Sequence, residues 1–450
     1  MYYVSTRGWS GSVTSAEAIK RGLAPDGGLF VPETIVRLDP EEIASFAEMD
    51  YRERAVSILR HYLDDYTEEE LRECVDGAYG SGRFDDERIA PVVRLSENAY
   101  MLELWHGPTS AFKDMALQIL PRLMVRANMK TRESRETVIL VATSGDTGKA
   151  ALEGFRDVEG TRIIVFFPED GVSQVQKMQM VSQEGSNVHV VAVKGNFDDT
   201  QNGVKAIFSD EELNREMLEN GFRFSSANSI NWGRLVPQIV YYFSAYADML
   251  AAREIAEGEK INIAVPTGNF GNILAAWYAR EMGLPINRLI CASNDNNVLT
   301  EFINTGIYNR EREFKKTISP SMDILISSNL ERLLFELTGR DAAQVRVWMD
   351  ELKNEGRYAV IGEEKRKLTE MYWGAYSTEE ETVETIREVY DDYGYLADPH
   401  TAVGIDVYEK YVISTGDITK TVIAATASPF KFNRSVASAV FGEDEIAGRD

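Results

Sequence analysis

The feature of this sequence that most constrains its fold is an alternation of short apolar runs with amphipathic helical segments from residue 137 onward. The runs TVILVAT, RIIVFFP and VHVVAV follow one another at strand–helix–strand spacing, and the alternation resumes at INIAVPT and ends at TVIAATAS. Apolar strands separated by helices in this way are typical of parallel sheets covered by helices. The sequence therefore predicts a doubly wound α/β enzyme in two lobes.

The length of the chain, 450 residues, exceeds the size of about 250–300 residues at which one hydrophobic core usually stops growing. We expect an N-terminal, mostly helical domain over residues 1–95, in which LAPDGGLFVPE (23–33) forms a turn-rich insertion. A smaller α/β domain is expected over residues 131–224. The large α/β domain would take residues 96–130 and 225–450, with a charge-rich helical insertion at about 310–400.

The formal net charge of −24 disfavours binding to nucleic acid or to an anionic membrane surface, because both are negatively charged. No run of about 18 apolar residues occurs, so we expect no membrane span and predict a cytoplasmic protein. The two cysteines, Cys74 and Cys291, and the four histidines never fall at metal-ligand spacing. These counts predict no metal site and two reduced cysteines that serve packing.

The loop PTGNFGNILAAW, residues 266–277, joins an expected parallel strand to a helix through two glycines. Such a loop presents unpaired backbone N–H groups and the positive end of a helix to an anion, and glycine allows a close approach or a positive φ. The pattern predicts a phosphate site. The alternative is a tight connection that needs glycine for its geometry alone.

A second strand–loop–helix unit, TSGDTGKAALEGF, superficially resembles a nucleotide-binding P-loop. Only two residues separate Gly145 from Gly148, however, and alanine rather than Ser or Thr follows Lys149. A P-loop needs four residues between its glycines and a hydroxyl for magnesium, so we reject that interpretation. The loop is suited to a substrate carboxylate or another anion, and Lys149 is expected to be solvated.

Motifs of several other enzyme classes, G-x-S-x-G, H-E-x-x-H and G-x-G-x-x-G after a strand, do not occur in the sequence. An anion-binding loop and a lysine in an apolar setting, Lys113 in HGPTSAFKDMALQ, instead suit pyridoxal phosphate, whose phosphate needs the loop and whose aldehyde needs an amine. Phe112 and Met115 can desolvate that lysine. The alternative for Lys113 is a solvated charge paired with Asp114 at a helix start.

Motifs along nearly the whole chain resemble, in the same order, those of the threonine synthase family. They are HGPTSAFKDMALQ, TSGDTGKAAL, GNFDD, NSINWGR, TGNFGN, SSNLERLLFEL, DPHTAVG and ATASPFKF, preceded by LAPDGGLFVP. The form resembled is the longer bacterial and fungal one, which has an N-terminal domain of its own. This resemblance implies a two-lobed, fold-type II pyridoxal-phosphate enzyme similar to the tryptophan synthase β subunit, with the cofactor bound mainly by the large domain.

The resemblance also implies roles for individual residues. Lys113 matches the lysine that binds the cofactor covalently, and Thr426 matches the residue that faces the pyridine nitrogen. The residues that match the loop at the cofactor phosphate are Gly268, Asn269, Phe270, Gly271 and Asn272. Those that match the substrate-binding segments are Ser144, Gly145, Asp146 and Thr147 at the carboxylate end, and Asn231 and Arg234 at the substrate phosphate. One departure is that Ser428 and Phe430 stand where many relatives carry histidine and alanine.

The reaction implied is the conversion of O-phospho-L-homoserine and water into L-threonine and phosphate, the last step of threonine biosynthesis, by a lyase that is a monomer or homodimer. Lys113 would move the Cα and Cβ protons, and the neutral hydroxyl of Thr426 would favour elimination over transamination. An alternative is a pyridoxal-phosphate-dependent threonine or serine dehydratase, or a hydroxyl-replacing synthase, which needs no second anion site. A further alternative is a non-catalytic relative that keeps the cofactor.

Overall fold

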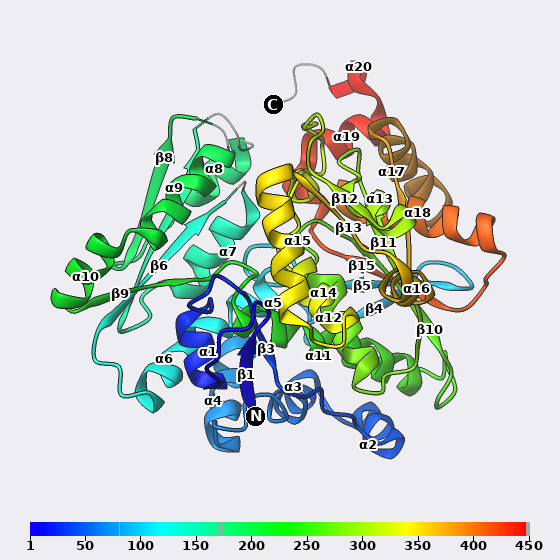
Figure 1. Cartoon of the computed structure of the whole chain (residues 1–450). Helices are drawn as coiled ribbons and strands as arrows, with labels where there is room; N and C mark the ends of the chain where they lie inside the picture. The colour runs from blue at the N-terminus through cyan, green and yellow to red at the C-terminus, as the bar shows by residue number, and fades with distance from the viewer. Residues whose placement is uncertain (81, 144, 170–171, 173, 196, 447–450) are drawn as a thin grey trace. The chain divides into compact units, whose positions relative to one another are not determined.

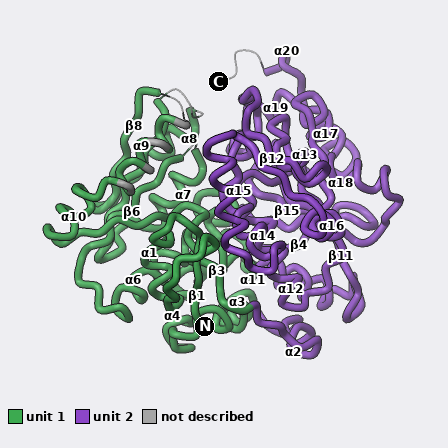
Figure 2. Tube along the Cα trace, in the orientation of Figure 1, with its two compact units in different colours: residues 1–34, 51–89, 107–240 green, residues 35–50, 90–106, 241–450 purple. Residues whose placement is uncertain are grey.

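The computed structural model describes residues 1–80, 82–143, 145–169, 172, 174–195 and 197–446. The chain divides into two compact units, and each unit is assembled from three separate stretches of sequence (Figure 2). Unit 1 contains residues 1–34, 51–89 and 107–240, and unit 2 contains residues 35–50, 90–106 and 241–450. The three sequence-based domains, 1–95, 96–130 with 225–450, and 131–224, stay a prediction.

The N-terminal part of unit 1 contains a small antiparallel sheet that the sequence analysis did not anticipate. Its strands are β1 (Tyr2–Ser5), β2 (Val13–Thr14) and β3 (Phe30–Pro32), in the order β2-β1-β3. β3 lies within the segment expected to be a turn-rich insertion. Strands of two to four residues are too short to show the alternation of apolar and polar residues by which a strand is recognised.

The helices of this part follow their sequence signals more closely. They are α1 (Ser15–Arg21), α3 (Tyr51–Leu59) and α4 (Glu68–Tyr79). At the start of α4 the Thr67 side chain accepts from the Glu70 backbone N–H, and the Glu70 carboxylate accepts from the Thr67 N–H. This reciprocal capping box satisfies two backbone donors that the helix itself leaves unpaired.

The larger sheet of unit 1 is entirely parallel and confirms the strands expected after residue 137. Its strands are β6 (Glu136–Ala142), β7 (Thr161–Pro168), β8 (Val188–Val193) and β9 (Phe222–Ser226), in the order β8-β7-β6-β9. The accompanying helices are α5 (Asp114–Leu117), α6 (Leu120–Lys130), α7 (Asp146–Phe155), α8 (Gln174–Val181), α9 (Phe197–Ser209) and α10 (Glu211–Glu219) (Figure 1).

Helices cover both faces of this sheet. Val204 of α9 packs with Leu140 and its alternate neighbours on β6. On the other face α7 approaches β7 so closely that a Cβ added at Gly148 would lie 2.8 Å from Val165. Val165 pairs with Val141 in the register of β6 and β7, and successive strand residues point to opposite faces. The doubly wound arrangement predicted from the sequence is therefore present in unit 1.

Unit 2 is built on a six-stranded sheet with the order β14-β11-β10-β15-β5-β4. The strands are β4 (Val92–Arg94), β5 (Ala99–Glu103), β10 (Ile261–Pro266), β11 (Ile286–Ser293), β14 (Tyr372–Tyr376) and β15 (Thr421–Ala425). All pairs are parallel except β4 with β5. β14 lies inside the segment 310–400, so the expectation of a purely helical insertion was wrong: YWGAY is short, and acidic helical sequence surrounds it.

Helices and short connecting elements complete unit 2. They include α12 (Gly271–Glu281), α13 (Val298–Thr305), α17 (Glu379–Tyr393), α18 (Pro399–Thr415) and α19 (Asn433–Phe441). The others are α2 (Pro40–Ser45), η1 (Phe46–Glu48), β12 (Ile307–Asn309), η2 (Pro320–Met322), α14 (Leu330–Leu337), α15 (Ala342–Glu355), β13 (Arg357–Ala359), α16 (Gly362–Met371), η3 (Pro429–Phe432) and α20 (Glu443–Ile446). α11 (Trp232–Ala251) has residues in both units.

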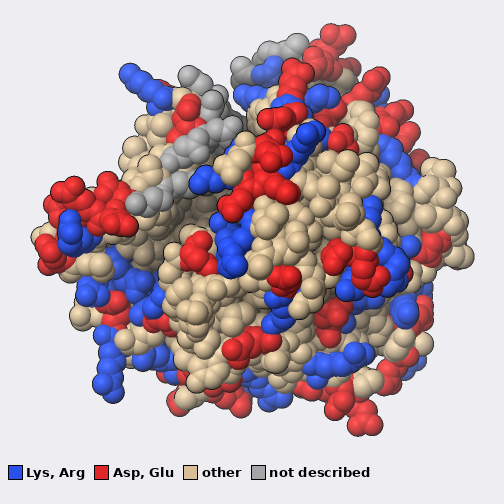
Figure 3. Space-filling model, in the orientation of Figure 1, with Lys and Arg blue, Asp and Glu red and all other residues tan. Residues whose placement is uncertain are grey.

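The surface of the protein carries both signs of charge. Figure 3 shows acidic and basic side chains interspersed over the visible face, with a group of acidic side chains over α10. No helix within the described ranges is both long and apolar enough to cross a membrane.

Candidate active site

Lys113 is buried at the start of α5, with only 8% of its surface exposed. Its ammonium nitrogen lies 3.6 Å from the carboxylate of Asp146 and 4.8 Å from the centre of the Phe112 ring. The carboxylate of Asp114 accepts hydrogen bonds from the backbone N–H and the hydroxyl of Thr109, at 2.7 and 2.8 Å. The burial argues against a solvated surface lysine and provides the apolar contact predicted from Phe112.

Asp146 belongs to the loop that follows β6 and starts α7. Its carboxylate is buried and accepts a 3.2 Å hydrogen bond from the side-chain amide of Gln176. Gly145 has a φ of 142°, and the Thr143 hydroxyl accepts from its N–H at 2.9 Å. The loop therefore brings one carboxylate to Lys113 and places the first-turn N–H groups of α7 beside it. Thr147 is half-buried in this turn.

Ser144 and Lys149 flank this loop and were also assigned from the sequence. Ser144 lies outside the described residues. Lys149 was expected to be solvated, but it is only partly exposed, and its ammonium contacts Glu153 at 3.4 Å and the amide oxygen of Gln183. That expectation was wrong because the side chain reaches a neighbouring loop, a contact that local sequence does not reveal.

Asn231 and Arg234 lie at the start of α11, and the structure uses them differently. The Asn231 amide donates to the backbone carbonyls of Ile19 and Ser226, at 2.9 and 3.0 Å, and its oxygen accepts from the Gly233 N–H at 2.9 Å. A substrate contact would have to replace part of this network. The hydrogen bonds of the Asn231 side chain are thus used within the protein, so the structure offers less support for a substrate contact by Asn231 than for one by Arg234.

Arg234 is buried, with 5% of its surface exposed, and its guanidinium donates to the Ala227 carbonyl at 2.9 Å. Within the part of the chain that the structure describes, no carboxylate forms an ion pair with it. Burial lowers the pKa of Arg234 from 12.5 to about 10. A buried arginine without a carboxylate is costly unless an anion compensates its charge.

In unit 2, the loop 268–270 joins β10 to α12 and presents the N-terminus of that helix. The left-handed backbone conformation falls on Phe270, with a φ of 61°, rather than on a glycine. Gly271 begins α12 and has no positive φ, so of the two roles that glycine allows here only the close approach remains. Asn269 is exposed, and Phe270 is buried with its ring 5.5 Å from that of Tyr372.

The remaining loop position, Asn272, is held by two tyrosines. Its side-chain oxygen accepts from the hydroxyls of Tyr241 and Tyr242, at 2.7 and 2.5 Å. These two hydrogen bonds fix the orientation of the amide group and therefore the direction in which its nitrogen points. This nitrogen is buried, and no described residue forms a hydrogen bond with it. A buried donor without a partner, beside the N–H groups of a helix start, fits a bound phosphate.

A segment that the sequence analysis quoted without assigning a role, SSNLERLLFEL, supports this loop. The Ser327 hydroxyl donates to the Gly268 carbonyl at 2.8 Å, and both the backbone N–H and the side-chain amide of Asn329 donate to the Asn269 carbonyl at 3.1 Å. The fully buried guanidinium of Arg332 in turn donates to the Asn329 side chain. In the sequence, these residues could be recognised only as part of the SSNLERLLFEL motif.

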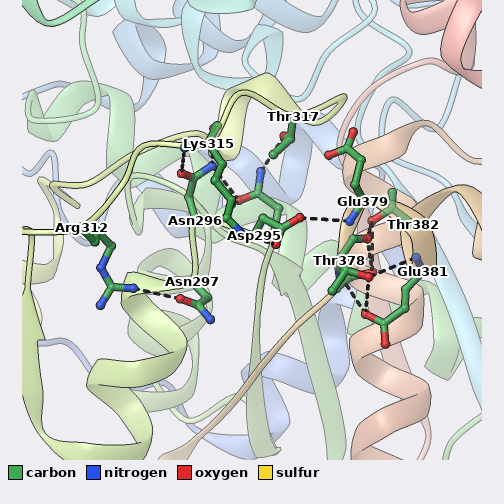
Figure 4. A network of polar contacts seen from close by, with 12 residues as sticks. Asp295, Asn296, Asn297, Arg312, Lys315, Thr317, Thr378, Glu379, Glu381 and Thr382 are labelled. Carbon is green, nitrogen blue, oxygen red and sulfur yellow. Dashed lines mark hydrogen bonds and ion pairs between the residues drawn. The ribbon is translucent and has the colours of Figure 1, made fainter.

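A polar network fixes the chain that lies against the loop (Figure 4). The carboxylate of Asp323 accepts from the side-chain amides of Asn294 and Asn296 and from the Thr317 hydroxyl, at 2.7 to 2.9 Å. Asp295, beside them, pairs with Lys315 at 2.8 Å and accepts from the Glu379 N–H. The segment 315–323 is therefore tied to the carboxyl end of β11 and to the start of α17.

Thr426 follows β15 and is buried, with 5% of its surface exposed. Its backbone N–H donates to the hydroxyl of Thr401 at 3.2 Å. Ser428 and Lys431, from the same segment, are also buried, whereas Phe430 is 77% exposed. At the position where many relatives carry histidine, this turn has the buried Ser428.

Two features concern metals and thiols. Within the described ranges, no group of three or more His, Cys, Asp and Glu side chains is arranged to hold a metal ion. Cys74 and Cys291 are both buried and free, and burial raises the pKa of each thiol to about 12.

Comparisons with known protein families agree with these observations. The family described as pyridoxal-phosphate-dependent enzyme matches residues 85–424, and the model for the threonine synthase N terminus matches residues 2–79. The model described as threonine synthase, C-terminal, matches residues 401–448. The fold and these matches define a pyridoxal-phosphate-dependent enzyme of fold type II with an N-terminal extension.

Individual relatives narrow this class. Threonine synthase from Pseudomonas aeruginosa is 40% identical over 98% of this chain and 91% of its own, and that from Saccharomyces cerevisiae is 36% identical over 98% and 89%. The crystal structure of pyridoxal-phosphate-bound threonine synthase from Brucella melitensis superimposes with a TM-score of 0.89 at 41% identity, covering 98% of this chain and 91% of that one. The chain belongs to the threonine synthase family.

Proposed function

We propose that this protein converts O-phospho-L-homoserine and water into L-threonine and phosphate, and that Arg234 binds the phosphate of the substrate. The observation that carries this choice of substrate is the buried guanidinium of Arg234 without a carboxylate partner in the described part of the chain. Its planar fork suits a phosphate dianion, which would compensate the buried charge. A substrate without phosphate would leave that charge uncompensated.

Lys113 is proposed to hold the cofactor and to move protons at the substrate Cα and Cβ. The bound cofactor supplies the electron sink that makes removal of the Cα proton feasible. The apolar surroundings of Lys113 favour its uncharged amine, whereas the carboxylate of Asp146 at 3.6 Å attracts a proton to it. These opposing influences suit a group that must alternately accept and donate a proton.

The proposed sites for the cofactor phosphate and the substrate carboxylate lie at the N-termini of α12 and α7. The loop 268–272 is proposed to hold the cofactor phosphate, with the unpartnered amide nitrogen of Asn272 as one donor, and Thr426 to face the pyridine nitrogen. At the start of α7, the N–H groups of residues 146 and 147 are proposed to receive the substrate carboxylate. The Asp146 side chain would repel that carboxylate, so we assign it to Lys113 rather than to the substrate.

The proposal is tested by the release of phosphate and threonine from O-phosphohomoserine by the purified protein supplied with pyridoxal phosphate. Serine and threonine serve as controls, because a dehydratase acts on both and produces ammonia. Cofactor binding without any product would favour a non-catalytic relative, and turnover of serine alone would favour the dehydratase. Cytoplasmic location and a monomeric or homodimeric state are part of this proposal.

A further inference from the structure

We infer that Asp398 and His400 form a positioning pair that fixes the backbone at two proposed cofactor contacts of unit 2, Gly268 through Ser321 and Thr426 through Thr401. This inference rests on the proposed function.

The pair is buried at the start of α18, where Asp398 and His400 expose 1% and 3% of their surfaces. The Asp398 carboxylate accepts from His400 Nδ1 at 2.7 Å, and His400 Nε2 accepts from the backbone N–H of Ser321 at 3.1 Å. A backbone N–H can only donate, so Nε2 carries no proton and the ring proton lies on Nδ1. Asp398 thereby selects the form of the ring that can hold Ser321.

Ser321 matters because its backbone lies against the phosphate loop. A Cβ added at Gly268 would lie 2.7 Å from the Ser321 carbonyl oxygen and 3.3 Å from the Met322 Cα. The ring of His400 is itself held by an edge-on contact with Phe432, at 4.9 Å between ring centres. A displacement of Ser321 would therefore be transmitted directly to the loop at Gly268.

The same carboxylate reaches the second contact. Asp398 accepts a hydrogen bond from the Thr401 hydroxyl, and that hydroxyl accepts from the Thr426 N–H at 3.2 Å. Asp398 also caps α18 by accepting from the backbone N–H groups of His400 and Thr401. Capping needs no imidazole, so a substitution of His400 distinguishes a helix cap from a positioning pair.

Two amide variants of the full-length protein distinguish the contribution of Nδ1 from that of Nε2. His400→Asn keeps an amide donor near the place of Nδ1 but does not reach Ser321. His400→Gln places an amide oxygen near the place of Nε2, where it can accept from the Ser321 N–H. The affinity of each apo-protein for pyridoxal phosphate, measured by absorbance titration, is compared with that for pyridoxal, which lacks the phosphate.

We expect His400→Asn to bind pyridoxal phosphate about tenfold more weakly, because a buried N–H is left unpaired, and to bind pyridoxal as the unsubstituted protein does. His400→Gln should recover most of the lost affinity. Equal affinities for pyridoxal phosphate in all three proteins would overturn the inference, and so would equal losses for both ligands together with a lower melting temperature. An unsubstituted protein that binds cofactor but releases no threonine would instead refute the proposed function.

Discussion

Substitution of Arg234 separates binding of an anion from support of the fold. Its guanidinium is buried, and burial lowers its pKa from 12.5 to about 10. At about 1.4 kcal/mol per pKa unit, the charged form is disfavoured in the folded protein by about 3 kcal/mol. This cost is present at pH 7, where arginine is charged in both folded and unfolded chains, and begins to decrease only as the pH rises above about 10.

Two substitutions of Arg234 are informative, because one removes the buried charge and the other keeps it. Arg234→Met removes the buried charge and also the hydrogen bond to the Ala227 carbonyl, which contributes about 0.5–1.5 kcal/mol. We expect the free energy of unfolding of the apo-protein to stay equal or to rise by about 1–2 kcal/mol. Arg234→Lys keeps a charge but replaces the planar fork with a point charge, so kcat/KM for O-phosphohomoserine should fall about 10- to 150-fold.

The assay compares phosphate release from O-phosphohomoserine with the slow reaction on serine, which has no phosphate to bind. Only the first reaction should suffer in either variant. Thermal denaturation of the apo-proteins supplies the second measurement. A lower melting temperature for Arg234→Met together with unaltered turnover by both variants would show that Arg234 is a structural arginine and that the phosphate binds elsewhere.

Three further predictions concern Lys113, Gly268 and Glu379. Lys113→Ala should still bind cofactor through the loop 268–272 but lose turnover, and borohydride should attach the cofactor of the unsubstituted protein to the peptide that contains Lys113. Gly268→Ala should weaken cofactor binding, measured by absorbance titration, because its Cβ would lie 2.7 Å from the Ser321 carbonyl oxygen. Glu379→Gln should raise the melting temperature at pH 7 and lose this advantage as the pH falls from the raised pKa of Glu379 toward 4.5, since burial, together with Asp323 and Asp295, raises that pKa.

The controls for these variants come from the same chain. Gly203→Ala is the match for Gly268→Ala, because among the described residues no atom beyond its chain neighbours and the backbone of its own helix lies within 4 Å of the added Cβ. Equal cofactor affinity of the two glycine variants would mean that the loop is not tightly packed, and a borohydride label on Lys149 or Lys431 would exclude Lys113 as the cofactor lysine. For Glu379→Gln, a gain that persists at pH 4 would show that charge is not its cause.

The strands recognised from the sequence are those with long apolar runs. β6, β7, β10 and β11 each have six to eight residues, most of them buried, so they stand out from the helices around them. β14 and β15 both have five residues, but all five residues of β15 are buried, whereas β14 has glycine at its centre and partly exposed residues on either side of it. Its place in the sheet is set by parallel pairing with β11, which local propensity does not specify.

The site shows a similar limit. Lys113 and the loop 268–272 could be named because each lies in a contiguous motif. The carboxylate beside Lys113, the serine backbone against Gly268 and the asparagine that holds the Asn269 carbonyl come from other parts of the chain. Motifs drew attention to Asp146 and Asn329, but a single sequence does not show which residue each of them contacts, because the contacts depend on which strand ends the fold places together.

The pairing of β5 with β15 has a consequence for biosynthesis. In the register of these strands Tyr100 lies opposite Val422, so one edge of β5 has no partner until most of the chain has been made. At about 5–20 residues per second, translation takes roughly 15–65 s to cover that interval. The four strands of the parallel sheet in unit 1, by contrast, are all made by Ser226. Early termination before β15 would leave one edge of β5 unpaired, and an unpaired strand edge favours aggregation.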